Sequence, residues 1–421
     1  MIDLKILRND PELVRESLRR RRSSVDLDAF IVLDARFREE RTRIDTLKNE
    51  QSKTTDRDRA KALKDEIRAL EEAYKTLEAE HEAVWKSIPN LLHPDAPDGD
   101  DDESNQVLRM VGTPREFTFI PRDHETIGVA RGWIDKETAA KVSGARFTYL
   151  FGDLVLLQYA LATFVTATLT SREMLARIIA NNGLVVSDKP FIPTIPPVIV
   201  NQSTMEKMGR LHPMDERYIL HDQGQVLIGS AEHSLGPIPM DKILEEDELP
   251  LRYFANTPAF RGEAGSAGRD VSGILRVHQF DKIEMESFVA PEDGLAEQDL
   301  FVALQEYFVS SLGLPYRVVF NSSGDTGSMD YRQRDVETWM PGQDKYRETH
   351  TSDYMTDYQA RRLGIRVKRA SGEKQYVHMN DATAMAMGRL LIAIIENYQN
   401  EDMTVTIPEV LRPFMGGRER I

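Results

Sequence analysis

Apolar residues recur along residues 63–84 at spacings that alternate between four and three. The positions are Leu63, Ile67, Leu70, Tyr74, Leu77, His81 and Val84, a pattern typical of a coiled-coil seam. An earlier stretch keeps the same phase with Phe30, Leu33, Phe37, Ile44 and Leu47, and Glu40 occupies the missing position. A short polar run, residues 51–56, separates the two stretches. The pattern predicts two long helices folded back on each other, as an arm at about residues 28–88.

The segments on either side of this arm differ from it. The first 26 residues predict a short strand-like start and then a helix, with Asp10 as N-cap and Pro11 at the first helical position. After the arm, several prolines and the acidic run 98–103 predict a linker whose composition cannot pack. We therefore expect an N-terminal domain at residues 1–106 and a larger domain at residues 107–421.

The larger domain contains short apolar runs between polar turns. These runs predict strands at 197–200, 225–228, 251–255, 282–289, 316–320 and 335–340. Longer stretches predict helices at 154–181, 296–312 and 384–399. The strands cluster and do not alternate regularly with helices. This arrangement favours the α+β class, an antiparallel sheet with helices packed against it.

Composition excludes some classes of site and leaves others open. The net charge of −15 counts mildly against nucleic-acid binding, but phosphates are bound by local patches of charge. The chain has no cysteine, and its nine histidines include no H-E-x-x-H pattern, so we expect no zinc site. No apolar run approaches the roughly 20 residues that span a bilayer. We expect a cytoplasmic protein that does not enter a membrane.

The usual glycine-rich nucleotide motifs are missing. The sequence contains neither G-x-x-x-x-G-K-[ST] nor a G-x-G-x-x-G after a strand, so ATP would have to be held by arginines and carboxylates. Two segments supply both arginines and carboxylates. The first, 260–270, opens with Phe260 and Arg261, and the second is 276–285. An arginine on a strand can hold a phosphate through two parallel hydrogen bonds. Taken alone, a glycine-rich hairpin in a protein without catalytic activity is an equally good interpretation.

This region resembles motif 2 of the class II aminoacyl-tRNA synthetases in its seryl form, F-R-x-E-A-G and then R-x-H-Q-F-x-K-x-E. The resemblance continues through the opening residues 1–11, the arm, I-P-N-L at 88–91, V-S-G-A-R-F at 142–147, motif 1 at 196–201, A-M-G-R of motif 3 at 386–389, and the end at 408–413. It implies the catalytic core of the seryl-tRNA synthetase family. It also implies that serine is activated with ATP and Mg²⁺ and transferred to tRNA(Ser), and it leaves tRNA(Sec) open as a further substrate. The arm would bind tRNA, and two chains would form a homodimer through motif 1.

The resemblance also implies a role for each residue at the ATP end of the site. Arg261 would hold the α-phosphate and Arg389 the far end of the triphosphate, and these two are the predicted catalytic residues. The remaining ATP contacts would be Gly262, Glu263, Val277, Phe280, Glu348, Thr349, His350 and Thr351. Glu348 would also contact Mg²⁺. Glu337 is a second metal candidate, for which an edge-strand acid is nearly as good an interpretation.

For serine, the resemblance implies a site made of Ser230, Ala231, Glu232, Arg261, Glu284 and Thr383. Glu232 would pair with the ammonium group of the substrate, and Glu284 would accept a hydrogen bond from its hydroxyl. A buried acceptor discriminates strongly against alanine, which leaves that acceptor unpaired. No general base is required, because the attacking carboxylate is already ionised. Catalysis would depend on alignment and on stabilisation of charge.

Three segments around the predicted serine site depart from the family pattern. They are D-A-T-A at 381–384, where N-G-[ST]-G is usual, H-T-S-D-Y at 350–354 and D-Y-R-Q-R-D at 330–335. Asp381 places a carboxylate where an amide is typical. Two alternatives therefore stay open: a paralogue that activates another small amino acid, including one that loads a carrier protein, and a non-catalytic protein that binds tRNA or ATP. The arm argues against a carrier-loading enzyme, and the presence of Arg261 and Arg389 argues against loss of ATP binding.

Overall fold

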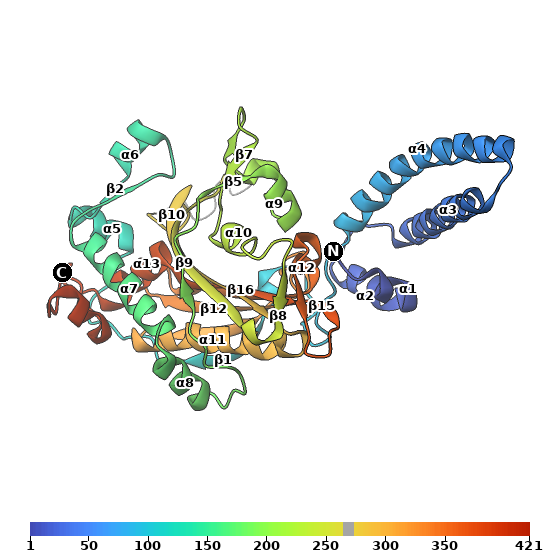
Figure 1. Ribbon diagram of the computed structural model, residues 1–421. Helices are drawn as coiled ribbons and strands as arrows, with labels where there is room; N and C mark the ends of the chain where they lie inside the picture. The colour runs from blue at the N-terminus through green and yellow to red at the C-terminus, as the bar shows by residue number, and fades with distance from the viewer. Residues whose placement is uncertain (264–272) are drawn as a thin grey trace. The chain divides into compact units, whose positions relative to one another are not determined.

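The computed structural model describes residues 1–263 and 273–421, and the central part of the predicted glycine-rich stretch, 264–272, lies outside the described residues. The chain divides into two compact units, Met1–Leu92 and His93–Ile421 (Figure 1).

All the regular secondary structure of the N-terminal unit is helical. It comprises α1 (Leu4–Asn9), α2 (Pro11–Arg20), α3 (Leu27–Lys53) and α4 (Arg57–Ser87). The predicted strand-like start is wrong, because the Asp3 side chain accepts a hydrogen bond from the Lys5 amide at 2.8 Å and caps a helix there. The predicted cap of α2 is confirmed, since Asp10 accepts from the Leu13 amide at 3.1 Å.

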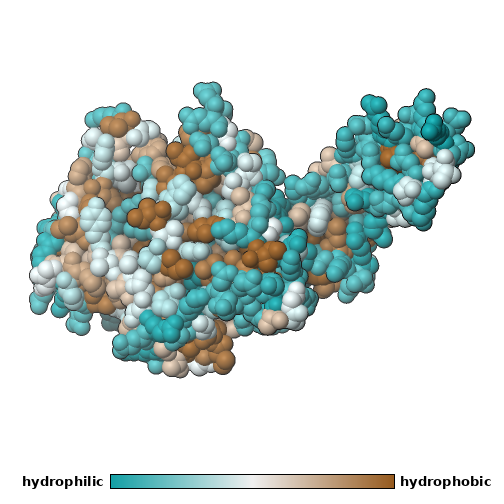
Figure 2. Space-filling view, in the orientation of Figure 1, coloured by the Kyte–Doolittle hydropathy of each residue, from teal (hydrophilic) through white to brown (hydrophobic). Residues whose placement is uncertain are grey.

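The two long helices α3 and α4 form the predicted arm. Their seam buries Ile44, Tyr74 and Leu77, and the Phe37 ring stacks on His81 with ring centroids 4.2 Å apart. Hydrophilic residues cover much of the visible surface of these two helices (Figure 2). A pair of helices with a narrow apolar seam and polar outer faces is the arrangement expected from the heptad spacing.

A buried carboxylate, Asp34 of α3, joins three helices of this unit. It accepts hydrogen bonds from Arg8 of α1 at 2.7 Å and from Arg38 at 3.1 Å, and it lies 3.0 Å from the Nε2 atom of His81 in α4. Burial alone would raise the pKa of Asp34, but the hydrogen bonds from Arg8 and His81 outweigh burial and hold that pKa below its ordinary value. The ionised carboxylate therefore helps to hold α1 against the arm.

The second unit is built on an eight-stranded sheet. In spatial order its strands are β1 (Gln106–Val111), β11 (Tyr316–Phe320), β12 (Arg332–Met340), β13 (Lys345–Thr356), β16 (His378–Ala386), β10 (Gln279–Val289), β9 (Leu251–Phe260) and β4 (Ile192–Pro193). All neighbours are antiparallel except β4 and β9. The predicted α+β class is confirmed.

Helices cover this sheet and share one apolar core with it. They include α7 (Asp153–Leu169), α8 (Arg172–Asn181), α11 (Gly294–Ser311) and α13 (Met387–Tyr398), and α11 runs along the sheet in Figure 1. The helix predicted at 154–181 is broken into α7 and α8, and the one predicted at 384–399 begins only at Met387 because residues 384–386 end β16. No single helix among the described residues is long and apolar enough to cross a membrane. Helices α7 and α8 are long and apolar enough only when they are taken together, and the angle between them is 80°.

Smaller elements complete the unit. They are α5 (His124–Ala130), β2 (Ile134–Asp135), α6 (Lys136–Ser143), β3 (Tyr149–Leu150), β5 (Ile199–Asn201), α9 (Gln202–Met208), β6 (Ile219–Leu220), β7 (Gln225–Leu227), α10 (Glu232–Leu235), β8 (Ile243–Glu245), α12 (Tyr358–Leu363), β14 (Arg366–Lys368) and β15 (Lys374–Tyr376).

The segment expected to be an unpacked linker is in part packed within the second unit. Ser323 donates its amide to the Pro97 carbonyl at 2.8 Å, and the Asn105 side chain donates to Asp325 at 2.8 Å. The Ser322 hydroxyl donates to the Asp101 carbonyl at 2.8 Å. The expectation that this composition cannot pack is wrong here, because backbone carbonyls and the Asn105 and Asp98 side chains make hydrogen bonds while most of the acidic side chains stay exposed.

Candidate active site

A cavity of about 500 Å³ lies at the middle of the sheet, where β13, β16 and β10 are neighbours. Most of the residues predicted for ATP and serine line it: Ser230, Glu232, Arg261, Glu263, Val277, Phe280, Glu284, Glu348, Thr349, Thr351, Thr383 and Arg389. They come from α10, β10, β13, β16, α13 and the segments next to them. The fold therefore brings together residues that are up to about 160 positions apart in the sequence.

Four of the predicted residues do not line the cavity. Ala231 is buried in a small apolar cluster, and Gly262 packs so closely on the Asp215 carbonyl that a Cβ atom would lie 2.2 Å from it. His350 is fully buried, and burial lowers its pKa to about 3. Glu337 forms an ion pair with Arg317. Glu337, the second metal candidate, lies directly opposite Glu348 on the neighbouring strand, but of the two Glu348 is the one that lines the cavity.

Two guanidinium groups predicted to contact ATP line the cavity. Arg261 donates to the Gly229 carbonyl at 3.0 Å, and its guanidinium carbon is 5.3 Å from the centre of the Phe280 ring. Arg389 pairs with the Glu348 carboxylate at 2.9 Å. Burial, followed by the charge of Arg389, lowers the pKa of Arg261. Neighbouring cations in this partly buried site repel each other, and a polyphosphate bound between them would relieve that repulsion and be stabilised by both.

The same cavity is lined by two carboxylates with different partners. The Oε1 atom of Glu232 accepts from Arg210 at 2.7 Å and from the Gln359 amide at 3.0 Å. Burial would raise the pKa of Glu232, but Arg210 outweighs it and lowers that pKa to about 2. Glu284 pairs with Lys282 at 2.6 Å, and burial raises its pKa. An ionised Glu232 suits an ammonium group, and a nearby Glu284 suits a hydroxyl.

A row of buried carboxyl groups continues beyond Glu284. Asp381 of β16 lies directly opposite Glu286 of β10 on one side and Asp353 of β13 on the other. Burial raises the pKa of all three well above its ordinary value. Arg210 approaches Asp381 at 3.6 Å. Asp381 and Asp353, which depart from the family pattern, therefore form one cluster with the arginine that also holds Glu232.

Sequence reasoning did not assign this arginine a role. Arg210 and Arg217 lie in an irregular segment with no periodic pattern, and Lys282 and Arg276 stood within the quoted motif without a role. For Arg210 no sequence signal pointed to the cavity, because its partners Glu232 and Asp381 belong to distant segments. For Lys282 a signal was available, because residues two positions apart on one strand, such as Lys282 and Glu284, point to the same face of the sheet.

Replacing Glu286 with glutamine is expected to raise the melting temperature more at about pH 8 than at about pH 5. Burial raises the pKa of Glu286, so the folded state keeps a proton that the unfolded chain releases above about pH 4. The free energy of unfolding therefore decreases as the pH rises between the unfolded and the folded pKa values. A neutral amide of similar shape removes this decrease.

Thermal unfolding of both proteins across this pH range measures the effect. The exposed Glu373, changed to glutamine, serves as the matched control and should leave the melting temperature unchanged. An equal shift at every pH would contradict the predicted buried proton.

Comparisons with known proteins match both units. Residues 1–92 match the seryl-tRNA synthetase N-terminal domain, and residues 218–398 match the tRNA synthetase class II core domain (G, H, P, S and T). The serine–tRNA ligase of Nitratidesulfovibrio vulgaris is 40% identical over 438 residues that cover 100% of both chains. That of Streptomyces coelicolor is 39% identical over 437 residues, which cover 100% of this chain and 98% of the relative.

Solved structures agree with these matches. The seryl-tRNA synthetase of Pyrococcus horikoshii, complexed with ATP, superposes with a TM-score of 0.90 at 32% identity and covers 100% of this chain and 99% of its own. The cytoplasmic serine–tRNA ligase of Naegleria fowleri, in complex with AMP, gives 0.86 at 31% identity and covers 100% and 98%. Since sequence and structure match along the whole chain, it belongs to the seryl-tRNA synthetase family of class II aminoacyl-tRNA synthetases.

Proposed function

We propose that this protein is a serine–tRNA ligase, which activates serine with ATP to seryl-adenylate and transfers the seryl group to tRNA(Ser). The observation that carries the proposal is a single cavity that is lined both by the guanidinium groups of Arg261 and Arg389 and by the carboxylates of Glu232 and Glu284. The first pair suits a triphosphate, and the second pair suits a small hydroxylated amino acid. The curated relatives of the same length are serine–tRNA ligases.

Activation joins a serine carboxylate oxygen to the α-phosphorus of ATP. The bond between that phosphorus and the bridging oxygen to the β-phosphate breaks, and pyrophosphate leaves with the electron pair. Arg261 stabilises the negative charge that develops around the phosphorus. Glu232 and Glu284 hold the ammonium and the hydroxyl, so that the carboxylate faces the α-phosphate. No side chain has to remove a proton in this step.

Of the two predicted metal ligands, which lie opposite each other on β12 and β13, Glu348 is the one proposed to bind Mg²⁺. Its carboxylate lines the cavity beside Arg389, whereas the Glu337 carboxylate is paired outside it. No group of three potential metal-ligating side chains occurs among residues 1–263 and 273–421. Mg²⁺ often binds through one or two carboxylates together with substrate phosphates, so Glu348 would hold it next to the triphosphate. Bound Mg²⁺ would neutralise part of the phosphate charge.

The arm, α3 and α4, is proposed to grip the tRNA through its backbone and shape. Removal of residues 40–70 should leave serine-dependent ATP–pyrophosphate exchange unchanged and lower aminoacylation at least about tenfold, because a loss of roughly 1.4 kcal/mol of binding already has that effect. Measuring both reactions on one preparation separates the two functions. Unchanged aminoacylation would show that the arm does not hold the tRNA.

The motif 1 region is proposed to form a homodimer interface. Ile195 is fully exposed and Ile192 of β4 is 45% exposed, next to the segment 196–201 that resembles motif 1. Exposed apolar side chains in one place are typical of an interface.

The relative from Naegleria fowleri is described as cytoplasmic, and we propose the same location for this protein.

Serine-dependent ATP–pyrophosphate exchange tests the proposal, with alanine and threonine as controls. Exchange with serine alone is the expected result. Exchange that depends on another small amino acid would favour the alternative that Asp381 and Asp353 suggest, a paralogue of different specificity. Absence of ATP binding in calorimetry would favour a non-catalytic protein.

A further inference from the structure

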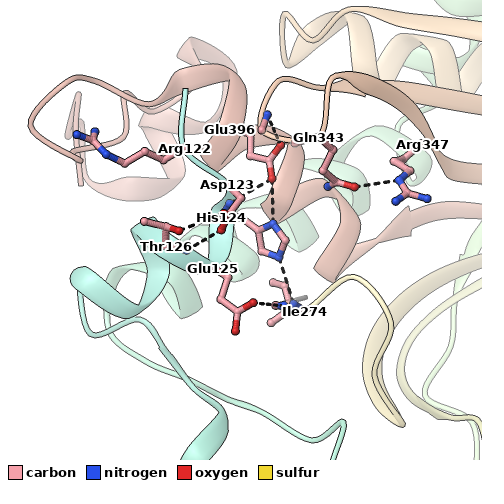
Figure 3. A network of polar contacts seen from close by, with 12 residues as sticks. Arg122, Asp123, His124, Glu125, Thr126, Ile274, Gln343, Arg347 and Glu396 are labelled. Atoms are coloured by element: carbon pink, nitrogen blue, oxygen red, sulfur yellow. Dashed lines mark hydrogen bonds and ion pairs between the residues drawn. The ribbon is translucent and has the colours of Figure 1, made fainter. Parts of the chain in front are cut away.

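A buried carboxylate at the end of α13 joins three parts of the catalytic unit. Glu396 is fully buried. Its Oε1 atom accepts from the His124 backbone amide at 3.1 Å and lies 2.9 Å from His124 Nδ1, and its Oε2 atom accepts from the Gly342 amide at 2.9 Å (Figure 3). Glu396 thereby ties α13 to the start of α5 and to the turn between β12 and β13.

The second ring nitrogen of His124 holds another segment. Its Nε2 atom accepts a hydrogen bond from the Ile274 amide at 3.2 Å (Figure 3). Because Nε2 accepts, Nδ1 carries the proton and donates it to Glu396, so the two contacts define one neutral tautomer. The neighbouring Glu125 accepts from the Gly273 amide at 2.7 Å. Two consecutive amides, those of Gly273 and Ile274, are thus held by two consecutive side chains of α5.

Gly273 itself gives an independent indication of this close contact. Its φ of +58° lies in the left-handed region, and a Cβ atom built there would lie 1.9 Å from His124 Nε2. Only glycine combines that backbone conformation with so close an approach to an imidazole ring. The sequence at this position is therefore adapted to the contact with His124.

The held segment leads directly into the cavity. Ile274, Leu275, Arg276 and Val277 all line it, and Arg276 pairs with Glu263 across the same wall. His124 and Glu396 do not line the cavity themselves. Their contacts fix the backbone from which one wall of the predicted nucleotide site is built.

We propose that His124, oriented by Glu396, is a positioning residue for the nucleotide, which acts by holding the amide of Ile274. The inference rests on the proposed function only in taking the nucleotide to be ATP. Because this wall of the cavity is already fixed, less conformational entropy is lost when ATP binds. Serine, which would be held by α10, β10 and β16, does not depend on this wall.

Two substitutions of His124 separate its two contacts. In His124→Asn the amide nitrogen can replace Nδ1 and keep the bond to Glu396, but nothing reaches the Ile274 amide. In His124→Gln the longer side chain can accept from Ile274 and gives up the bond to Glu396. Thr126→Val, on the same helix, removes a hydroxyl that donates only to Asp123 and serves as the control.

Full-chain variants are compared by ATP–pyrophosphate exchange and thermal unfolding. His124→Asn is expected to raise the KM for ATP about tenfold, the effect of one lost buried hydrogen bond of about 1.4 kcal/mol, with the KM for serine unchanged. His124→Gln is expected to stay closer to the wild-type KM for ATP while its melting temperature falls. A His124→Asn variant that changes both KM values equally, or only the melting temperature, would overturn the proposal.

The same experiment distinguishes failure of this inference from failure of the proposed function. If the wild-type protein binds ATP in calorimetry without serine-dependent exchange, the proposed function fails, and weaker ATP binding by His124→Asn would still support the inference. If the wild-type protein exchanges normally and His124→Asn matches it, the inference fails alone. Absence of any ATP binding by the wild-type protein overturns both.

Discussion

Replacing Arg261 with alanine is expected to lower kcat for serine-dependent ATP–pyrophosphate exchange about 10²–10³-fold, the usual loss when one preorganised charge is removed from a transition state. The guanidinium is held by the Gly229 carbonyl and lies beside the Phe280 ring. It is therefore aligned before substrate arrives. Since charge grows on the α-phosphate only during attack, the effect should fall on kcat more than on the KM for ATP.

Two further variants make this result specific. Arg261→Lys keeps the positive charge and loses the planar fork, so its activity should lie between those of wild type and alanine variant. Arg317→Ala removes an arginine that pairs with Glu337 outside the cavity and should leave exchange unchanged. A kcat for Arg261→Ala within about threefold of wild type, less than roughly 0.7 kcal/mol, would contradict the proposed role.

Replacing Glu284 with alanine is expected to remove most of the preference for serine over alanine. The Glu284 carboxylate is 1% exposed and lines the cavity, so a substrate without a hydroxyl leaves it unpaired. Loss of a buried acceptor costs about 2–3 kcal/mol, and kcat/KM for serine should fall by roughly 10²-fold while that for alanine falls less. Exchange measured with each amino acid gives the ratio directly.

Glu286→Gln is the matched control for this prediction. Glu286 lies two residues further along the same strand and does not line the cavity, so its replacement should leave the serine-to-alanine ratio unchanged. An equal loss with serine and alanine in Glu284→Ala would show that Glu284 supports the site without recognising the hydroxyl.

Local patterns in the sequence were sufficient for the arm and for the class of the catalytic unit. The heptad positions from Phe30 to Val84 predict α3 and α4, because the apolar residues that pack between two such helices recur at a fixed spacing along each helix. Four of the eight strands of the sheet, β9, β10, β11 and β12, were predicted from short apolar runs, and the range 316–320 coincides with β11. The motif residues predicted most of the cavity lining, although the use of each residue there is still a prediction.

Only the tertiary structure decided how the cavity is completed. The strands β13 and β16 were not predicted, because their cavity-facing residues, such as Glu348 and Asp381, are polar and interrupt the apolar alternation that marks a strand. Residues with distant partners could not be assigned either, since Arg210 meets Asp381 and His124 meets Glu396 only after folding. Spacing along the chain records contacts within an element, whereas ion pairs and hydrogen bonds between elements depend on how those elements pack.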